Sequence, residues 1–466
     1  MQKLSFQDAF FLRAESGNCP FHVAALMVLK FPEDAPRNHL RELAKLFGQI
    51  GEVWPVFSRK LADPNNLNNP HWIKAEDFDA SDHILHYRLP KYGNMEDLLS
   101  LIAHSHERVL DRTRPLWQAH LIEGLPGKRF AVYFKVHHAL VDGVGGIKMI
   151  REMLTQDPQG TLLDRKREEQ TAKHHDKHSL GELVKHSIEV ILKQSQAVTE
   201  ASGMLANMGL DSLLGKKDRP QVPFSAPRTL FNQELGTKRR LIVSELELEQ
   251  LHRISKHFGG TINDVLVAIC GSALRSYLLE LDALPERSLD AGLPVSIKSP
   301  NAAEGNQLSF IICPFVTDEE DAAERLKRVI TITRKAKKDL AHISPEASEN
   351  LATMTMVPFL MVSLTHSSQR VPPVFNAIVS NVPGAKHKLF LEGAELESLY
   401  PLSVVTDGMG LNITAISYDG KLCLGITAAP SNEPHVECLN EKIQQGFAEL
   451  QARVREEINK EELCNA

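Results

Sequence analysis

The stretch His137-His138-Ala139-Leu140-Val141-Asp142-Gly143 decides how the rest of this chain is interpreted. It directly follows residues 130–136, a run that is almost entirely apolar and β-prone, as in a strand covered on both faces. Three glycines within residues 143–146 then separate it from a helical pattern that starts at Ile147. The two histidines are therefore predicted to stand at the end of a buried strand, facing a turn, where catalytic side chains are commonly presented.

The spacing of the motif favours general-base chemistry. A histidine near its ordinary pKa of about 6.5 is a competent base at neutral pH. Asp142 follows His138 by four residues across the turn, close enough to orient the site or to anchor the loop to a basic residue elsewhere. The sequence contains no GxSxG nucleophile elbow and no cysteine in the loop, which favours direct transfer without a covalent intermediate.

Two other interpretations of the motif remain open at this point. A histidine beside a strand is commonly structural, and His138 with Asp142 could also hold a metal ion. Adjacent histidines on an extended backbone, however, point to opposite faces and rarely chelate one ion. We therefore expect no metal at this site.

The motif resembles a known family signature. HHALVDG is similar to the HHxxxDG motif of the acyl-CoA-dependent acyltransferases, which include chloramphenicol acetyltransferase, nonribosomal peptide condensation domains and bacterial wax ester synthases. Pro115-Leu116-Trp117 resembles the PLW motif of the bifunctional wax ester synthase/acyl-CoA:diacylglycerol acyltransferases, and Asn263-Asp264 resembles their ND motif.

The resemblance extends over almost the whole chain. Residues 4–12, with Glu15 and then His22-Val23, are similar to the start of that family, and residues 380–384 (SNVPG) to a late segment. Two positions depart from the pattern. Phe21 stands where methionine is expected, and Lys298 where arginine is common, which bears on the identity of the partner of Asp142.

The family implies a fold and a reaction. The expected fold has two chloramphenicol-acetyltransferase-like domains with the active site in a channel between them. The expected reaction moves an acyl group from acyl-CoA to a long-chain alcohol or a diacylglycerol, with His138 as general base and His137 and Asp142 shaping its loop. Acyl-CoA is then a substrate, and no bound cofactor is expected.

Several residues are assigned supporting roles with structural alternatives. Gly143, Asn263 and Asp264 are predicted to support the site, although an Asn-Asp pair in the first turn of a helix is often only a cap. Pro115, Leu116 and Trp117 are predicted to line the acyl tunnel, with core packing as the alternative. Asn263 and Asn381 are candidate donors to the oxyanion of the tetrahedral intermediate.

The amino-acid composition limits the kinds of protein that this chain can be. A chain of 466 residues with 42% hydrophobic residues suggests two well-packed domains, and its net charge of −6 argues against nucleic-acid binding. Six cysteines without a CxxC pair are typical of free thiols in a reducing cytoplasm. No signal peptide or long apolar run is apparent, so we expect a cytoplasmic protein whose contact with membrane or lipid droplets is at most peripheral.

Shifts in composition predict the domain organisation. We expect an N-terminal domain at 1–165, a linker at 166–228 and a C-terminal domain at 229–466. Apolar residues recur at helical spacing through 180–208, which predicts one amphipathic helix in the linker that either packs on the protein or contacts lipid.

The C-terminal part alternates predicted strands and helices, which indicates an α/β or α+β sandwich. Thr261 is a good N-cap for a helix that carries Asn263-Asp264, and Asp419-Gly420 is a strong hairpin signal. Strands are predicted at 241–244, 293–298, 308–316, 376–380, 411–418 and 421–427. The basic stretch 325–338 is predicted to be a solvated helix face, or else a site for the phosphates of coenzyme A or for anionic lipid.

Two other functions are considered. A condensation-type enzyme would use a carrier-bound thioester, but no carrier module is present in the sequence. A noncatalytic lipid-binding protein would be expected to have lost His138, and the motif is intact.

Overall fold

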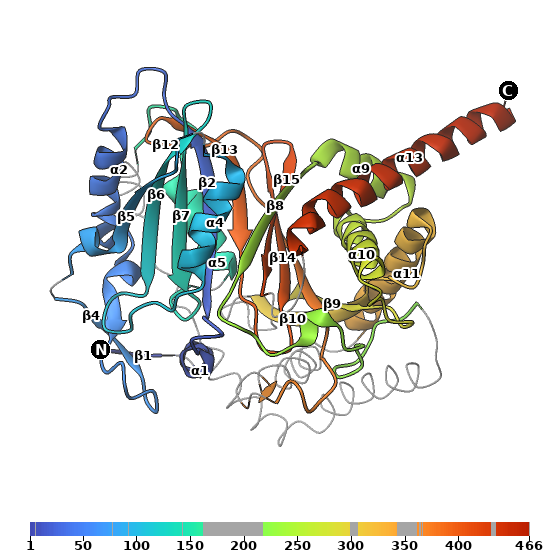
Figure 1. The fold of residues 1–466 in the computed structure, drawn as a ribbon, viewed down its shortest axis with the longest axis horizontal. Helices are drawn as coiled ribbons and strands as arrows, with labels where there is room; N and C mark the ends of the chain where they lie inside the picture. Colours follow the sequence, from blue (N-terminus) through green and yellow to red (C-terminus); the bar gives the residue numbers. More distant parts are fainter. Residues whose placement is uncertain are drawn as a thin grey trace.

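Two six-stranded mixed sheets, each covered by helices, form the body of the protein (Figure 1). They are seen in a computed structural model, which describes the chain except for 5, 77, 92, 142, 162–217, 299–305, 343–360, 363–364, 366, 430–434 and 466. The mixture of strands and helices in both halves confirms the predicted α/β (α+β) class.

The first sheet carries the motif. Its strand order is β12-β13-β2-β7-β6-β5, so β7 is an inner strand with antiparallel neighbours on both sides. These strands are β2 (His22–Lys30), β5 (Ile84–Arg88), β6 (Trp117–Leu125), β7 (Arg129–His137), β12 (Phe390–Leu391) and β13 (Ala394–Leu402). The prediction of a buried strand that ends at the histidine pair is confirmed.

The second sheet has the order β10-β9-β11-β14-β15-β8. It comprises β8 (Arg240–Glu247), β9 (Asp290–Lys298), β10 (Asn306–Pro314), β11 (Ala377–Val382), β14 (Leu411–Tyr418) and β15 (Lys421–Ala428). All six predicted strands of the C-terminal part are present, with ends that differ by a few residues. A small third sheet joins β1 (Gln2–Lys3), β4 (His71–Lys74) and β3 (Arg59–Leu61).

Helices cover the faces of both sheets. In the first half these are α1 (Phe6–Ala14), α2 (His39–Phe47), α3 (Ile50–Val53), α4 (Met95–His106) and α5 (Gly143–Met153), with short 3-10 turns η1 (Pro55–Ser58) and η2 (Ala80–His83). In the second half they are η4 (Leu230–Asn232), α9 (Leu248–His257), α10 (Ile262–Glu280), α11 (Ala322–Ala341), η5 (Val436–Cys438) and α13 (Leu439–Asn465).

The helix cap and the hairpin turn predicted in the second half are both present. The Thr261 side chain caps α10, and the Asp264 carboxylate bonds back to the Thr261 backbone in a reciprocal capping box. Asp419 and Gly420 both have positive φ, as a tight hairpin between β14 and β15 requires.

The strand β13 corrects the predicted division of the chain. Although it belongs to the predicted C-terminal domain, it pairs with β2 of the first sheet, with Leu402 opposite Ala24. The chain then returns to the second sheet at β14. A boundary at 229 therefore does not separate the two sheets, because each half of the sequence contributes to the first one.

Close packing holds the two sheets together where β13 crosses. A Cβ on Gly425 of β15 would lie 1.9 Å from the carbonyl oxygen of Pro401 on β13, so no other residue fits there without displacement. Glu245 of β8 accepts hydrogen bonds from the hydroxyls of Ser398 and Tyr400 on β13. The contact between the sheets thus combines close backbone approach with a partly buried polar cluster.

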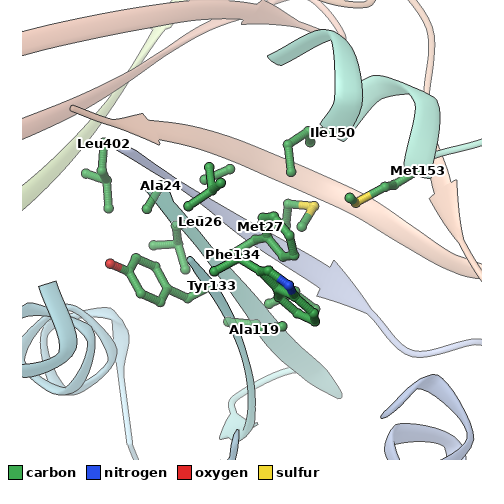
Figure 2. Packing of buried hydrophobic residues seen from close by; sticks show 14 of the residues in the cluster. Ala24, Leu26, Met27, Ala119, Tyr133, Phe134, Ile150, Met153 and Leu402 are labelled. Carbon is green, nitrogen blue, oxygen red and sulfur yellow. The ribbon is translucent and has the colours of Figure 1, made fainter. Parts of the chain in front are cut away.

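The core of the first half lies on the face of β7 that carries Phe134. Rings of Phe47, Phe57 and Trp117 pack around Phe134 there. Figure 2 shows Met153 of α5 pointing toward Met27 of β2 in this core. The opposite face of β7, with Tyr133, lies against the end of α4.

Among the described residues one helix, α10, is long and apolar enough to cross a membrane, with 19 residues and a mean hydropathy of 1.3. Most of it is buried in the second half, as in the core helix of many proteins. The amphipathic helix predicted at 180–208 lies outside the described residues.

The basic stretch on α11 is exposed, as predicted, at Lys327, Arg334, Lys337 and Lys338, but not at every position. Arg325 is 2% exposed and donates to the carbonyl oxygen of Glu319. Arg328 lies near the carboxylates of Asp218 and Asp318. Arg325 and Arg328 therefore form contacts within the protein.

Candidate active site

The histidine pair is held in place by the backbone of its neighbours. β7 ends at His137, a turn follows, and α5 begins at Gly143. The amide of His137 donates to the carbonyl of Leu116, and that of His138 donates to the carbonyl of Phe21, at 2.9 and 2.8 Å. The segments before β6 and β2 therefore clamp the turn from both sides.

His137 faces the interior. Its ring is completely buried, and its Nδ1 accepts a hydrogen bond from the amide of Ala139 at 3.0 Å. A neutral ring that accepts at Nδ1 carries its hydrogen on Nε2. That Nε2 lies 3.3 Å from Oε1 of Glu15, an ion-pair distance, although the angle falls short of a well-aligned hydrogen bond.

Glu15, just after α1, is the acidic centre of this arrangement. Its side chain is 2% exposed and contacts Arg112, whose Nη2 lies 3.0 Å from Oε2. The same guanidinium donates to the carbonyl of Leu12, and the amide of Phe21 donates to Oε1. Burial raises the pKa of Glu15, but the contacts from His137 and Arg112 outweigh burial and hold that pKa below its ordinary value.

His138 has a different environment. Its ring is half-buried and lies 4.5 Å, centroid to centroid, from the ring of Phe11. Phe11 belongs to a small apolar cluster with Phe10, Ala14, Cys19 and Phe21. One histidine is thus enclosed beside a carboxylate, whereas the next stands beside apolar rings at a partly open position, as a general base for an apolar substrate requires.

The C-terminal half also reaches this end of β7. Val404, shortly after β13, packs on the Phe11 cluster, and the thiol of Cys19 donates to the carbonyl of Val405. The buried guanidinium of Arg239 donates to the carbonyl of Asn18. The site lies where the two halves of the chain meet, which agrees with the position expected from the resemblance.

The predicted tunnel residues Pro115, Leu116 and Trp117 are all buried. The Trp117 indole donates to the carbonyl of Phe57 and packs among core rings, and Leu116 supplies the carbonyl that binds His137. These contacts accord with the core-packing alternative, and a role as a tunnel wall stays a prediction.

The predicted support residues on α10 have contacts of their own. One carboxylate oxygen of Asp264 accepts from Thr261, and the other accepts from the hydroxyl of Thr333 on α11 at 2.7 Å. Asn263 is half-buried, and Asn381 on β11 is exposed. Asp264 therefore acts as a cap that joins two helices, whereas the predicted oxyanion roles of the asparagines stay predictions.

Two family models match the chain. The wax ester synthase/diacylglycerol acyltransferase catalytic domain matches residues 4–266, and the WS/DGAT C-terminal domain matches residues 304–451. The chain belongs to the wax ester synthase/diacylglycerol acyltransferase family. It is therefore an O-acyltransferase.

Members of this family from several bacteria are similar over nearly the full length. The O-acyltransferase WSD of Acinetobacter baylyi is 32% identical over 94% of this chain and 94% of its own. A Mycobacterium tuberculosis protein, provisionally named a diacylglycerol O-acyltransferase, is 34% identical over 97% and 99%. The solved structure of the wax ester synthase/diacylglycerol acyltransferase from Marinobacter aquaeolei VT8 has a TM-score of 0.76 and 30% identity over 97% of this chain and 100% of its own.

More distant structures share the fold alone. The starter condensation domain of rhizomide synthetase covers 97% of this chain with a TM-score of 0.58 and 13% identity. This likeness shows that the fold of the two sheets and their helices is shared beyond the family.

Two parts of the predicted site are not fully described. Asp142 lies outside the described residues, so its partner stays open. Gly143, which follows Asp142 in the sequence, is the first residue of α5.

In the late family segment, a Cβ on Gly384 would lie 1.8 Å from the carbonyl oxygen of Ser417, which explains why glycine stands there.

Glu15 and Arg112 were not assigned a role from the sequence. The available signal was an acidic residue directly after the mainly apolar segment 9–14, within the stretch that resembles the family's start. Arg112 carries no local signal, because 97 residues separate it from its partner.

Proposed function

We propose that this family member transfers the acyl group of a long-chain acyl-CoA to the hydroxyl of a long-chain alcohol or a diacylglycerol, with His138 as general base. The observation that carries the mechanism is the contrast between the enclosed His137, beside Glu15, and the partly open His138. The activities named for the Acinetobacter and Marinobacter proteins support the substrate classes.

The proposed chemistry needs one base. His138 takes the proton of the acceptor hydroxyl as its oxygen attacks the thioester carbonyl, forming a tetrahedral intermediate. Collapse of that intermediate breaks the carbon–sulfur bond, and protonated His138 returns the proton to the thiolate of coenzyme A. A thiol with a pKa near about 8.5 is a good leaving group, whereas an alcohol resembles water at about 15.7 and requires the base.

This mechanism requires neither a covalent intermediate nor a bound cofactor or metal. Acyl-CoA is consumed as a substrate. Because the acceptors are insoluble in water, we propose that the enzyme works in the cytoplasm and contacts a membrane or lipid-droplet surface peripherally. Co-sedimentation with liposomes containing dioleoylglycerol tests this contact, and protein that stays in the supernatant contradicts it.

The reaction is tested with purified protein, palmitoyl-CoA and either hexadecanol or dioleoylglycerol. We expect thiol release that depends on the acceptor, together with a wax ester or triacylglycerol in the extracted lipid. His138→Ala is the matched control for background hydrolysis. Thiol release that is independent of both acceptors would contradict the proposed function.

A further inference from the structure

A buried lysine lies directly behind the histidine pair. Lys135 precedes His137 by two residues on β7, so the two side chains share one face of the sheet. Only 1% of Lys135 is exposed. Its ammonium donates to the carbonyl oxygens of Ser105 and Arg108, at 2.7 and 3.1 Å, at the end of α4. The carboxyl end of a helix is a favourable place for a cation.

The groups around Lys135 come from three elements. His22 of β2 and His106 of α4 lie near Lys135, and the centroids of the two imidazole rings are 4.6 Å apart. Burial and the positive charge of Lys135 lower the pKa of both histidines. The side chains of His120 and Arg108 lie within electrostatic range of Lys135, and Arg239 lies within electrostatic range of His22. The neighbouring charge that favours the protonated amine is the carboxylate of Glu15.

The carbonyls that Lys135 binds belong to the segment that carries Arg112. This segment, residues 105–112, is held at its start by Lys135 and at its end by the contact of Arg112 with Glu15. Between them, the Glu107 carboxylate accepts from the amide of Arg239. Loss of the ammonium would remove this donor from the carbonyls of Ser105 and Arg108 and release one end of the segment.

We propose that Lys135 is a positioning residue for acyl transfer, which fixes the segment 105–112 so that Arg112 and Glu15 hold the His137 ring and the turn bearing His138. The proposal rests on the proposed function, because the reaction it serves is the one assigned to His138. Lys135 itself does not contact substrate in this role.

The first test compares Lys135→Met with Tyr133→Phe. The control removes a hydroxyl from the same face of β7, which contacts the ring of His106 and not the backbone carbonyls of Ser105 and Arg108 that Lys135 binds. We expect Lys135→Met to lower kcat roughly 10- to 100-fold with KM for palmitoyl-CoA unchanged. Tyr133→Phe should keep kcat within about twofold of the wild type. Equal kcat in Lys135→Met and wild type overturns the proposal.

Hydrogen exchange supplies a readout that does not depend on activity. Amides of residues 105–112 should exchange faster in Lys135→Met than in wild type, while those of α2 are unchanged. Lys135→Gln, which keeps one donor, is the second variant should Lys135→Met fail to fold, and we expect the same changes at smaller size. Unchanged exchange at residues 105–112 in a folded variant overturns the proposal.

A double variant separates positioning from general stability. If Lys135 acts through Glu15, then adding Lys135→Met to Glu15→Gln should lower kcat by less than twofold beyond Glu15→Gln alone. Multiplication of the two separate losses would mean that Lys135 acts elsewhere, and overturns the proposal. The proposed function fails separately, through full activity in His138→Ala.

Discussion

Nε2 of His137 lies 3.3 Å from Oε1 of Glu15, and both side chains are almost completely enclosed. This pairing gives the two neighbouring histidines unequal roles. Nδ1 of His137 accepts a hydrogen bond from the amide of Ala139, and Nε2 of the same ring faces the carboxylate of Glu15. It can orient the turn, whereas the reacting proton is left to His138.

Replacement of His138 with alanine should therefore abolish acyl transfer. We expect kcat to fall by about 10²- to 10⁴-fold, the usual contribution of a general base, with an unchanged circular dichroism spectrum. His137→Ala should retain more activity but melt at a lower temperature, since it removes a buried ring and leaves Glu15 without that contact. The reverse ranking of the two activities would show that the roles are assigned wrongly.

The Glu15–Arg112 pair should matter for rate as well as stability. Glu15→Gln removes the carboxylate that contacts His137 and Arg112, and we expect about 1 to 3 kcal/mol of lost stability with a clear decrease in kcat. Arg112→Met should have a similar effect. Arg114→Met is the matched control, because Arg114 pairs with Asp82 at the exposed surface, where ion pairs contribute about 0 to 1 kcal/mol. Equal rates in Arg112→Met and Arg114→Met would contradict the assignment.

Lys135 should make stability depend on pH above neutrality. Burial lowers its pKa to about 7, whereas an unfolded lysine titrates near about 10.4. Between these values the unfolded chain holds a proton that the folded chain has released, so this contribution favours folding increasingly as pH rises. Below about pH 7 both states are protonated and the contribution is constant.

The variant Lys135→Met lacks this dependence. The unfolding free energy of the variant relative to that of the wild type should therefore fall by up to about 1.4 kcal/mol per pH unit above about pH 7. Urea unfolding at pH 7, 8 and 9 measures the difference, with Tyr133→Phe as control. A difference that does not change with pH would count against a neutral buried amine.

Glycine at position 425 should be required for the contact between the sheets. In Gly425→Ala the new methyl group would meet the Pro401 carbonyl at 1.9 Å, and we expect a loss of about 1 to 3 kcal/mol or more. Gly236→Ala is the control, because a Cβ there meets nothing within 4 Å. Thermal melting compares the two, and equal melting temperatures would show that β13 can move away from β15 at little cost.

Features set by neighbouring residues could be predicted from the sequence. The alternation of turn and apolar residues placed the end of β7 at the histidine pair, Thr261 capped α10, and Asp419-Gly420 formed the hairpin. Each depends on backbone preferences and hydrogen bonds within a few residues.

Features that depend on residues far apart in the sequence could not be predicted from it. The pairing of β13 with β2 joins residues as far apart in the sequence as Ala24 and Leu402, and any apolar edge of similar length would satisfy the same pattern. Arg112 is one of many arginines, and only the folded chain brings it to Glu15. The role of Asp142 stays a prediction, since it lies outside the described residues.

The insertion of β13 also fixes when the active site can be completed during synthesis. The edge of β2 has no partner until Ala394–Leu402 has left the ribosome, although the histidine motif emerges much earlier. At about 5 to 20 residues per second, tens of seconds separate the two events. For that time the nascent chain exposes an apolar strand edge, a template for pairing with other chains. We therefore expect the growing polypeptide to depend on chaperones bound to translating ribosomes, and the enzyme to gain activity only after Leu402 has been synthesised.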